Sequence, residues 1–421
     1  MRARRLISVL NTLTLRGLGS GVAVLFTVLV ARYLENEAAA HFFLLFNITM
    51  IAAVCFRWGL DEVVIRRVAS AAPAEVPILA RQLVGLSHQR VLVWAVFAVT
   101  ATLALLHPVV RSALYGLQTA ETLIAMGASA LIALVACAAR VHQGVGQTNL
   151  AAFILNILTP LLSLLGLLVL IVSGVNVNAF DLIILYAGAA IAGYLGVVSL
   201  RYGSPLSILI ASRDTNTQDL LPDTRAANKL GGVVLAQQAL SWGALLIIPL
   251  TYGDAVYKGF VVTQKVATLI SLVMLAVNFT FSSRFAALHA TGQSVELRRM
   301  VKFSIIAILA ASTLASVIVV LFRDLVFNFA RIEANMSGVL IVLLISQVLL
   351  SLASLYSVVL SMCRDDNFLL ATQGITNTSG LLLFLLLSQT SNLEVACIAF
   401  AASYFILLLV LGMRIRRITA A

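Results

Sequence analysis

Two basic side chains, Arg16 and Lys265, lie inside long apolar stretches of the sequence. A charge at membrane depth is costly, and a residue that carries one there is a candidate for ligand binding. Arg16 belongs to a series that repeats every four residues and so shares one helix face: Ser8, Thr12, Arg16 and Ser20. Lys265 lies beside a second series at helical spacing: Gln264, Thr268, Ser271 and Asn278. Fixed cations beside hydrogen-bonding groups could bind an anionic, hydrated ligand that hydrocarbon excludes.

Three more polar side chains in apolar segments, Asn47, Gln237 and Gln238, extend this set. Each candidate also has a simpler explanation than ligand binding. Arg16 could reach the lipid headgroups from the inner boundary, and Ser, Thr and Gln often only join neighbouring helices. Lys265 is about eight residues, or roughly 12 Å, from the outer end of its segment, which strains such a reach. The candidate ligand-binding residues are Arg16, Asn47, Gln237, Gln238, Gln264, Lys265, Thr268, Ser271 and Asn278.

The elements that must position these residues follow from composition. Of 421 residues, 61% are hydrophobic and 11% are charged, and the mean hydropathy is +1.04. An ordinary soluble domain carries about 25% charged residues. Lipid offers no partners for backbone groups, so each spanning segment must be a helix of roughly 20 apolar residues. The sequence therefore predicts an all-α, polytopic membrane protein.

Apolar windows predict about twelve transmembrane helices in two halves of six. The first six windows are 8–31, 39–57, 91–110, 122–139, 151–173 and 180–200. The second six are 231–250, 257–281, 303–322, 338–362, 368–388 and 394–413.

The distribution of basic residues predicts the orientation of these helices. With the N-terminus inside, 21 of the 28 Lys and Arg residues fall on the cytoplasmic side and 5 on the other. This bias predicts that both termini are cytoplasmic. It also accounts for the net charge of +11 through contact with anionic membrane lipid rather than nucleic acid. Arg57 and Asp61, an i, i+4 pair at a cytoplasmic helix end, are interpreted as a solvated helix end.

The longest polar stretch, residues 201–229, divides the chain. We expect an N-terminal six-helix half over 1–200, a cytoplasmic linker over 201–229, and a C-terminal six-helix half over 230–421. A weak internal match appears when the second half is shifted back by 219 residues. Because six is even, both halves enter from the same side, which predicts a parallel repeat.

Short motifs over almost the whole chain carry a family resemblance. They are Ala31–Leu34, Gly59–Leu60, Val64–Ala69, Gln143–Asn149, Asp254–Gly259, Phe285–His289 and Glu296–Arg299. With these motifs the sequence resembles the Wzx-type O-antigen or polysaccharide flippases, within the multidrug/oligosaccharidyl-lipid/polysaccharide exporter superfamily. Residues 35–41 differ from the Gly-Pro-Glu pattern usual in that family.

The resemblance implies a cargo, a place and partners. The cargo is an oligosaccharide on a polyprenyl diphosphate, moved across the bacterial cytoplasmic (inner) membrane for polysaccharide biosynthesis. A polysaccharide polymerase is the candidate protein partner, and we expect a monomer that is not an enzyme. We expect no cofactor and no metal, since the five His residues are scattered and the four Cys residues form no Cys-x-x-Cys.

Two other functions stay open. A drug or metabolite exporter of the same superfamily is the first, and a membrane polymerase or ligase of lipid-linked glycans is the second. Short outer loops argue against the enzyme, and no P-loop sequence occurs. No acidic residue falls clearly within a predicted span, which argues against cationic drugs and against a coupling ion. We therefore expect the membrane potential to drive transport.

Overall fold

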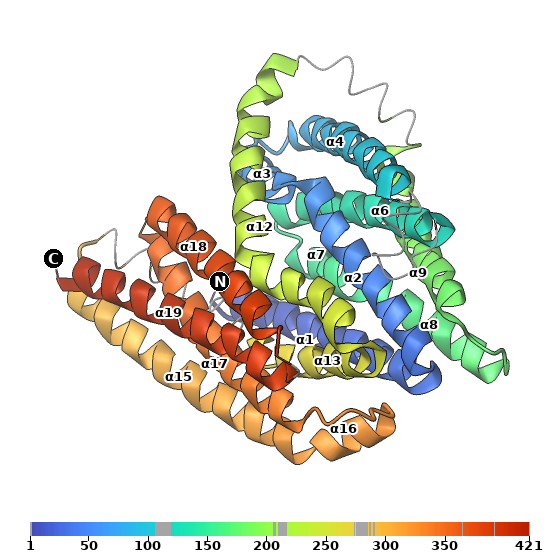
Figure 1. Cartoon of the computed structure of the whole chain (residues 1–421). Helices are drawn as coiled ribbons and strands as arrows, with labels where there is room; N and C mark the ends of the chain where they lie inside the picture. Colours follow the sequence, from blue (N-terminus) through green and yellow to red (C-terminus); the bar gives the residue numbers. More distant parts are fainter. Residues whose placement is uncertain are drawn as a thin grey trace. The chain divides into compact units, whose positions relative to one another are not determined.

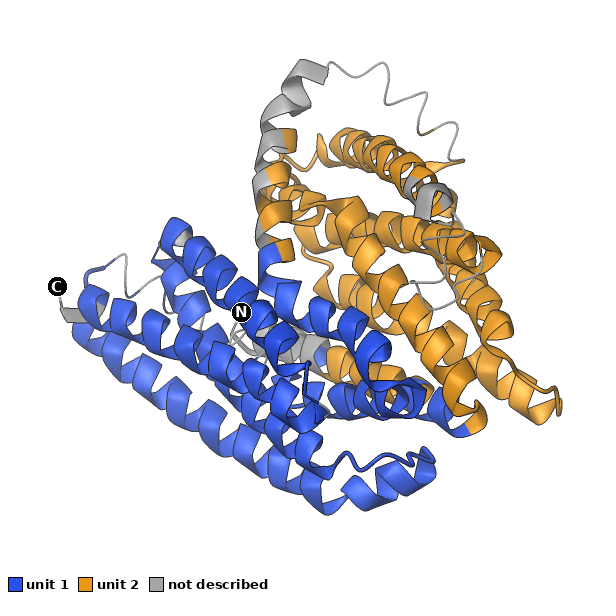
Figure 2. Cartoon of the chain, viewed as in Figure 1, with its two compact units in different colours: residues 1–13, 27–32, 236–421 blue, residues 14–26, 33–235 orange. Residues whose placement is uncertain are grey.

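A computed structural model of the chain describes residues 2–105, 119–204, 208, 217–272, 274, 285, 288, 291–363, 365–390 and 392–420. Every regular element in these ranges is a helix (Figure 1). The chain divides into two compact units (Figure 2). Unit 1 contains Met1–Leu13, Thr27–Arg32 and Ala236–Ala421, and unit 2 contains Thr14–Phe26 and Tyr33–Leu235. The first helix, α1 (Arg2–Tyr33), contributes residues to both.

Unit 2 is built from helices that follow one another in sequence. They are α2 (Asn36–Arg57), α3 (Leu60–Ser70), α4 (Val76–Leu105), α6 (Thr119–Gly144), α7 (Thr148–Phe153), α8 (Thr159–Val172), α9 (Ala179–Tyr194) and α10 (Leu200–Tyr202). The long helix α12 (Thr217–Tyr252) begins in this unit and continues into unit 1.

A sharp corner between α2 and α3 sets the direction of the chain after the second helix. Trp58 has φ 40° and Gly59 has φ 77°, so two successive residues are in the left-handed region. Glycine adopts that conformation without a steric penalty. A β-carbon at Gly59 would also lie 2.4 Å from the backbone oxygen of Ala227 in α12. This corner therefore requires glycine twice over, for its dihedral angle and for its close packing.

Two helices of unit 2 contain π-helical turns, at Ile154–Leu158 and at Leu195–Ser199. A π-turn has one residue more than the α-helical turn it replaces. The first turn ends two residues before Pro160, which has no N–H to donate to the carbonyl of Asn156. Both turns pack against α6.

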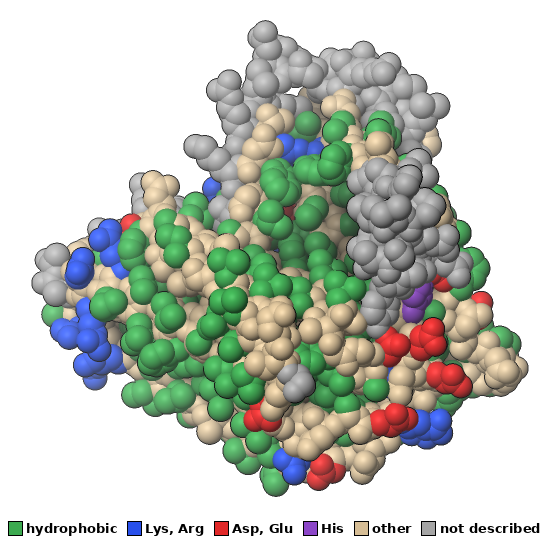
Figure 3. Space-filling view, in the orientation of Figure 1, with side chains coloured by type: hydrophobic (Ala, Val, Ile, Leu, Met, Phe, Trp, Pro, Cys, Tyr) green, Lys and Arg blue, Asp and Glu red, His purple; other side chains and the backbone are tan. Residues whose placement is uncertain are grey.

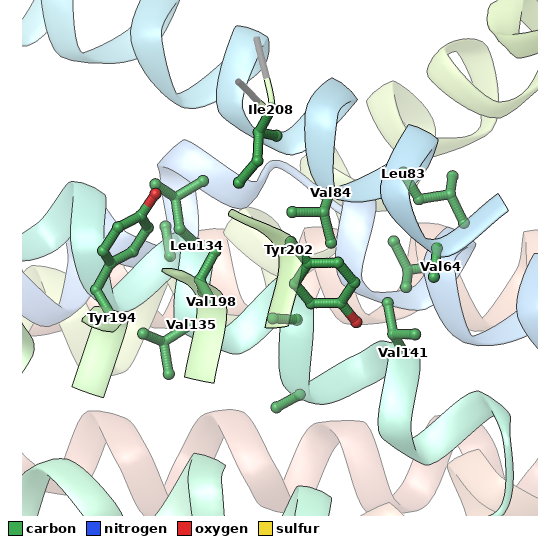
Figure 4. Packing of buried hydrophobic residues seen from close by; sticks show 14 of the residues in the cluster. Val64, Leu83, Val84, Leu134, Val135, Val141, Tyr194, Val198, Tyr202 and Ile208 are labelled. Atoms are coloured by element: carbon green, nitrogen blue, oxygen red, sulfur yellow. The ribbon is translucent and has the colours of Figure 1, made fainter. Parts of the chain in front are cut away.

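The core of unit 2 joins α3, α4 and α6 to the end of α9 and its π-turn. Figure 4 shows this cluster, in which aliphatic side chains surround Tyr194 and Tyr202. Leu83, Val84 and Val198 are almost completely buried there. The Tyr194 hydroxyl donates a 2.8 Å hydrogen bond to His88 Nε2, because His88 Nδ1 donates to the Val84 carbonyl. This packing holds the ends of α4 and α6 together.

Unit 1 is built from the C-terminal helices. They are the second part of α12, from Ala236 onward, and α13 (Asp254–Thr268), α15 (Ser294–Leu321), α16 (Arg323–Phe329), α17 (Ser337–Met362), α18 (Asp366–Leu387) and α19 (Leu393–Ala420). Helices α15, α17 and α19 pack together around Phe285, Ile308, Leu355 and Leu411. In Figure 3 apolar side chains cover the length of these helices, and basic side chains gather where α15 begins and α19 ends. That pattern is typical of a lipid-facing surface with a charged end.

The all-α, polytopic fold predicted from sequence is confirmed. Eleven helices in the described ranges are long and apolar enough to cross a membrane, and they coincide with eleven of the twelve predicted spans. The predicted span 257–281 is described only in part, as α13. Three starts differ from prediction: α4 begins at residue 76 rather than 91, α12 begins at 217 within the expected linker, and α15 begins at 294 rather than 303. Stretches that contain polar residues extend these helices beyond their apolar windows. The division at 1–200, 201–229 and 230–421 stays a prediction.

Candidate functional site

The candidate residues are divided between the units. Asn47 and Arg16 belong to unit 2, and six of the others belong to unit 1. Asn278 lies outside the described residues.

In unit 1, Lys265 lies in the last turn of α13. The helix ends at Thr268 and a turn follows at residues 269–270, so the predicted span 257–281 is not one continuous helix in its described part. Lys265 is half-buried. Backbone carbonyls without helical partners accumulate at a helix C-terminus, where they stabilise a cation. The break in the helix therefore supplies part of the environment that Lys265 needs.

The hydroxyl groups beside Lys265 donate within their own helix end. Thr268 Oγ1 donates to the Lys265 carbonyl at 2.7 Å, and Ser271 Oγ donates to the Thr268 carbonyl at 2.7 Å. Each hydroxyl has one proton, so its oxygen can then only accept. Such oxygens suit the hydroxyl donors of a sugar better than the oxygens of a phosphate. Gln264 is half-buried one residue before Lys265.

Gln237 joins three helices of unit 1. Its Nε2 donates to Gln373 Oε1 on α18, and Gln373 Nε2 donates to Ser357 Oγ on α17 at 3.0 Å. Gln238 is half-buried on the same helix. The geometry of Gln237 agrees with the simpler explanation, a bond that joins helices.

Sequence reasoning missed the partner of Gln237. Gln373 lies in a polar series within the predicted span 368–388: Thr372, Gln373, Thr376 and Asn377. These residues fall on one face, and Asn377 Nδ2 donates to the Gln373 carbonyl at 2.8 Å. The spacing of this series was visible in the sequence and could have identified it.

In unit 2, Arg16 is half-buried on α1, and it lies close enough to Arg140 of α6 for their charges to interact. Asn47 is 5% exposed within α2. Helix α1 approaches the first π-turn closely, because a β-carbon at Gly19 would lie 2.6 Å from the backbone oxygen of Asn156. This approach fixes the part of α1 that carries Arg16.

The pair Arg57 and Asp61 differs from its expected solvated state. Asp61 Oδ2 lies 3.4 Å from Arg57 Nη1 and 3.6 Å from Arg140 Nη2. The side chains are only 16% (Arg57), 17% (Asp61) and 19% (Arg140) exposed. The sequence could not indicate this, because Arg140 comes from α6, far along the chain. The interpretation of this pair as a solvated helix end is therefore wrong.

A carboxylate also lies within a candidate span, against expectation. Glu121 belongs to the first turn of α6, is 5% exposed, and places its Oε2 2.6 Å from His41 Nε2 of α2. The predicted span began at residue 122, one position too late to include it. Among the described residues, no group of three or more His, Cys, Asp or Glu could hold a metal ion.

Solved transporter structures resemble this chain along nearly its whole length. One is an inward-facing conformation of a multidrug resistance MATE family transporter of the MOP superfamily, with a TM-score of 0.77 and 13% identity over 98% of this chain and 99% of that chain. An outward-facing conformation of such a transporter has a TM-score of 0.66 and 13% identity over 98% of this chain and 96% of that chain. A mutant of the Vibrio cholerae MATE transporter VcmN has a TM-score of 0.67 and 15% identity over 99% of this chain and 96% of that chain.

Sequence comparison adds no nearer relative, since neither a protein-family profile nor a curated protein sequence matches. The chain has the MATE transporter fold with its two halves. Identities of this size show the fold alone, because one fold hosts many functions.

Proposed function

We propose that this chain exports an organic, anionic cargo across a bacterial cytoplasmic membrane, with a polyprenyl-diphosphate-linked oligosaccharide as the cargo class. The observation that carries the proposal is a fixed, half-buried cation in each unit of a transporter fold, Arg16 in unit 2 and Lys265 in unit 1. A phosphate-bearing head cannot enter hydrocarbon alone, and a fixed cation lowers that barrier. The acceptor oxygens of Thr268 and Ser271 would receive sugar hydroxyls.

Export of drugs or metabolites is a second candidate, and a specific observation favours it. The solved structures with this fold include multidrug resistance transporters. That likeness supports drug export more directly than it supports a polysaccharide flippase. Glu121 adds to this candidate, because a buried carboxylate could bind a cationic drug or a coupling ion. The charge of the transported molecule therefore separates the two candidates.

The experiment uses the full chain in proteoliposomes. One set of vesicles contains a labelled lipid-linked oligosaccharide, and another receives a cationic fluorescent dye. Movement of the oligosaccharide with no movement of the dye is the expected result. Dye transport without oligosaccharide transport would establish the second candidate instead.

Variants of Lys265 test its role. Lys265→Ala should abolish oligosaccharide movement, and Lys265→Arg should retain more activity than Lys265→Gln because charge matters more than shape. Lys302→Ala is the matched control, since Lys302 is an exposed lysine of the same unit. Full activity of Lys265→Ala would remove Lys265 from the site. Arg16→Ala is expected to behave as Lys265→Ala does.

The driving force is proposed to be the membrane potential. Moving one elementary charge across 100 mV is worth about 2.3 kcal/mol, so an outward-moving head with about two negative charges would gain roughly 4–5 kcal/mol. Oriented vesicles with an imposed inside-negative potential and no ion gradient should therefore transport. Transport that instead follows a pH gradient and is lost in Glu121→Gln would refute this and assign proton coupling to the pair with His41.

A further inference from the structure

Three arginines and one aspartate of unit 2 lie near the buried Cys137 of α6. Arg57, Arg90, Arg140 and Asp61 all lie within electrostatic range of its sulfur atom. Arg57 ends α2, and Asp61 lies in the first turn of α3. Arg90 lies in the middle of α4, and Arg140 lies near the end of α6. The helix order places this arginine cluster on the side predicted to be cytoplasmic. Arg16 of α1 joins it through its neighbour Arg140.

The charges of the arginine cluster do not balance. Four arginines against one aspartate leave a net charge of +3. Asp61 holds two of them only loosely, since its Oδ2 is 3.4 Å from Arg57 Nη1 and 3.6 Å from Arg140 Nη2. Charge-assisted hydrogen bonds are usually about 2.7–2.9 Å long. A network built only for stability would pair its partly buried charges more evenly.

Neutral oxygens hold the guanidinium groups in place. Arg57 Nε donates to the Ala53 carbonyl at 3.2 Å, and Arg140 Nη1 donates to Gln143 Oε1 at 2.7 Å. Arg90 donates to the Trp58 carbonyl at 3.4 Å and to Asn228 Oδ1. These bonds orient the side chains without neutralising them.

One donor of the arginine cluster has no acceptor. Arg140 Nε is buried and meets no hydrogen-bond partner within the described part of the chain. A buried donor without a partner costs free energy, and an acceptor oxygen from a ligand would remove that cost. Arginine presents five N–H donors in a rigid fork that matches phosphate oxygens.

The geometry points to a phosphate-binding site formed by Arg16, Arg57, Arg90 and Arg140, with Asp61 as its internal counter-charge. Its ligand is a phosphate or diphosphate ester, and the excess of three positive charges suits a dianion or trianion. The inference deepens the proposed function and rests on it for the cargo: the site would receive the cargo's diphosphate on the cytoplasmic side before export. An anionic phospholipid headgroup offers the same chemistry.

The test is direct binding of inorganic pyrophosphate to the purified full chain in phosphatidylcholine nanodiscs, measured by calorimetry. Pyrophosphate should bind the unmodified chain, and Arg140→Gln should bind it about tenfold more weakly, which corresponds to one lost charge-assisted bond. Arg81→Gln is the matched control, because Arg81 is an exposed arginine of α4. It should bind as the unmodified chain does.

Asp61→Asn separates a binding role from a structural one. Removing the negative charge should tighten pyrophosphate binding by roughly threefold or more, because a competing anion is gone. A purely structural aspartate would predict unchanged or weaker binding, which would overturn the site. Arg57→Gln replaces Arg140→Gln as the test variant if Arg140→Gln does not fold. It should weaken pyrophosphate binding by the same factor.

Two further arms identify the source of the phosphate. If a phospholipid headgroup occupies the site, phosphatidylglycerol in the nanodisc should weaken pyrophosphate binding, whereas displacement by lipid-linked oligosaccharide identifies the cargo. Pyrophosphate binding without oligosaccharide transport keeps the site and refutes the proposed function. Oligosaccharide transport without pyrophosphate binding, or equal binding by Arg140→Gln and the unmodified chain, overturns the site.

Discussion

A glycine series in α1 allows a sharp test of how that helix packs. Gly17, Gly19 and Gly21 are spaced two residues apart, yet in the described part of the chain only Gly19 closely approaches another helix. A β-carbon at Gly19 would lie 2.6 Å from the backbone oxygen of Asn156 and 2.9 Å from its carbonyl carbon. Among the described residues, no atom lies within 4 Å of a β-carbon placed at Gly17 or Gly21. Alanine at Gly17 or Gly21 should therefore stabilise the protein, whereas alanine at Gly19 should not.

The magnitude follows from two contributions. Alanine in place of glycine within a helix stabilises it by about 1 kcal/mol, and this gain is common to all three positions. Overpacking costs about 1–3 kcal/mol, and it applies to Gly19 alone. The clash is with backbone atoms, so no side-chain rotation can relieve it. The difference between Gly19→Ala and either control isolates the steric cost.

Thermal denaturation of the tagged chain in detergent, followed by size-exclusion chromatography, measures this difference. At roughly 2 °C per kcal/mol, Gly19→Ala should melt about 2–6 °C below Gly17→Ala and Gly21→Ala. Gly19→Val should melt lower still. If Gly19→Ala melts with the controls or above them, α1 does not approach the π-turn at Asn156 as described.

Three other perturbations test separate parts of the structure. Gly59→Ala should lower the melting midpoint more than Gly174→Ala, since both have positive φ but only Gly59 approaches a backbone oxygen of α12, at 2.4 Å; equal losses would contradict the α3–α12 packing. Glu121→Ala should cost about 2 kcal/mol by leaving His41 without its carboxylate, and the double variant with His41→Ala should lose less than the sum, as a double-mutant cycle would show. A reporter fused after Ala421 should report the cytoplasm, and an external signal would overturn the predicted orientation.

The membrane spans were predictable because the cost of placing a charge or an open backbone in lipid is decided locally. The predicted windows coincide with the helices wherever polarity ends the membrane segment, as at Arg57. They differ where a helix continues into polar sequence, as in α4 and α12. The same error hid Glu121, because hydropathy does not show that α6 begins about one turn before its apolar window.

The candidate site was predictable only in its parts. Arg16 and Lys265 stand out because each interrupts an apolar stretch. The contact of Arg140 with Asp61 depends on tertiary packing of α6 against α3, which no spacing along the sequence encodes. The break after Thr268 was equally hidden, because no glycine or proline marks it in the sequence. Folding, rather than local pattern, therefore decides which charges share a site.

The two π-turns bear on how this chain should be aligned with its structural relatives. Each turn holds one residue that an uninterrupted α-helix would not have, so residues beyond it are rotated by about 100° on the helix surface. An alignment with a relative that lacks the turn needs a single-residue gap within a helix, at 154–158 or 195–199. Without that gap, Pro160 and everything up to the next loop would be matched one position out of register. Residue-by-residue transfer of function from such a relative is therefore sound only outside 154–172 and 195–202, or once both gaps are placed.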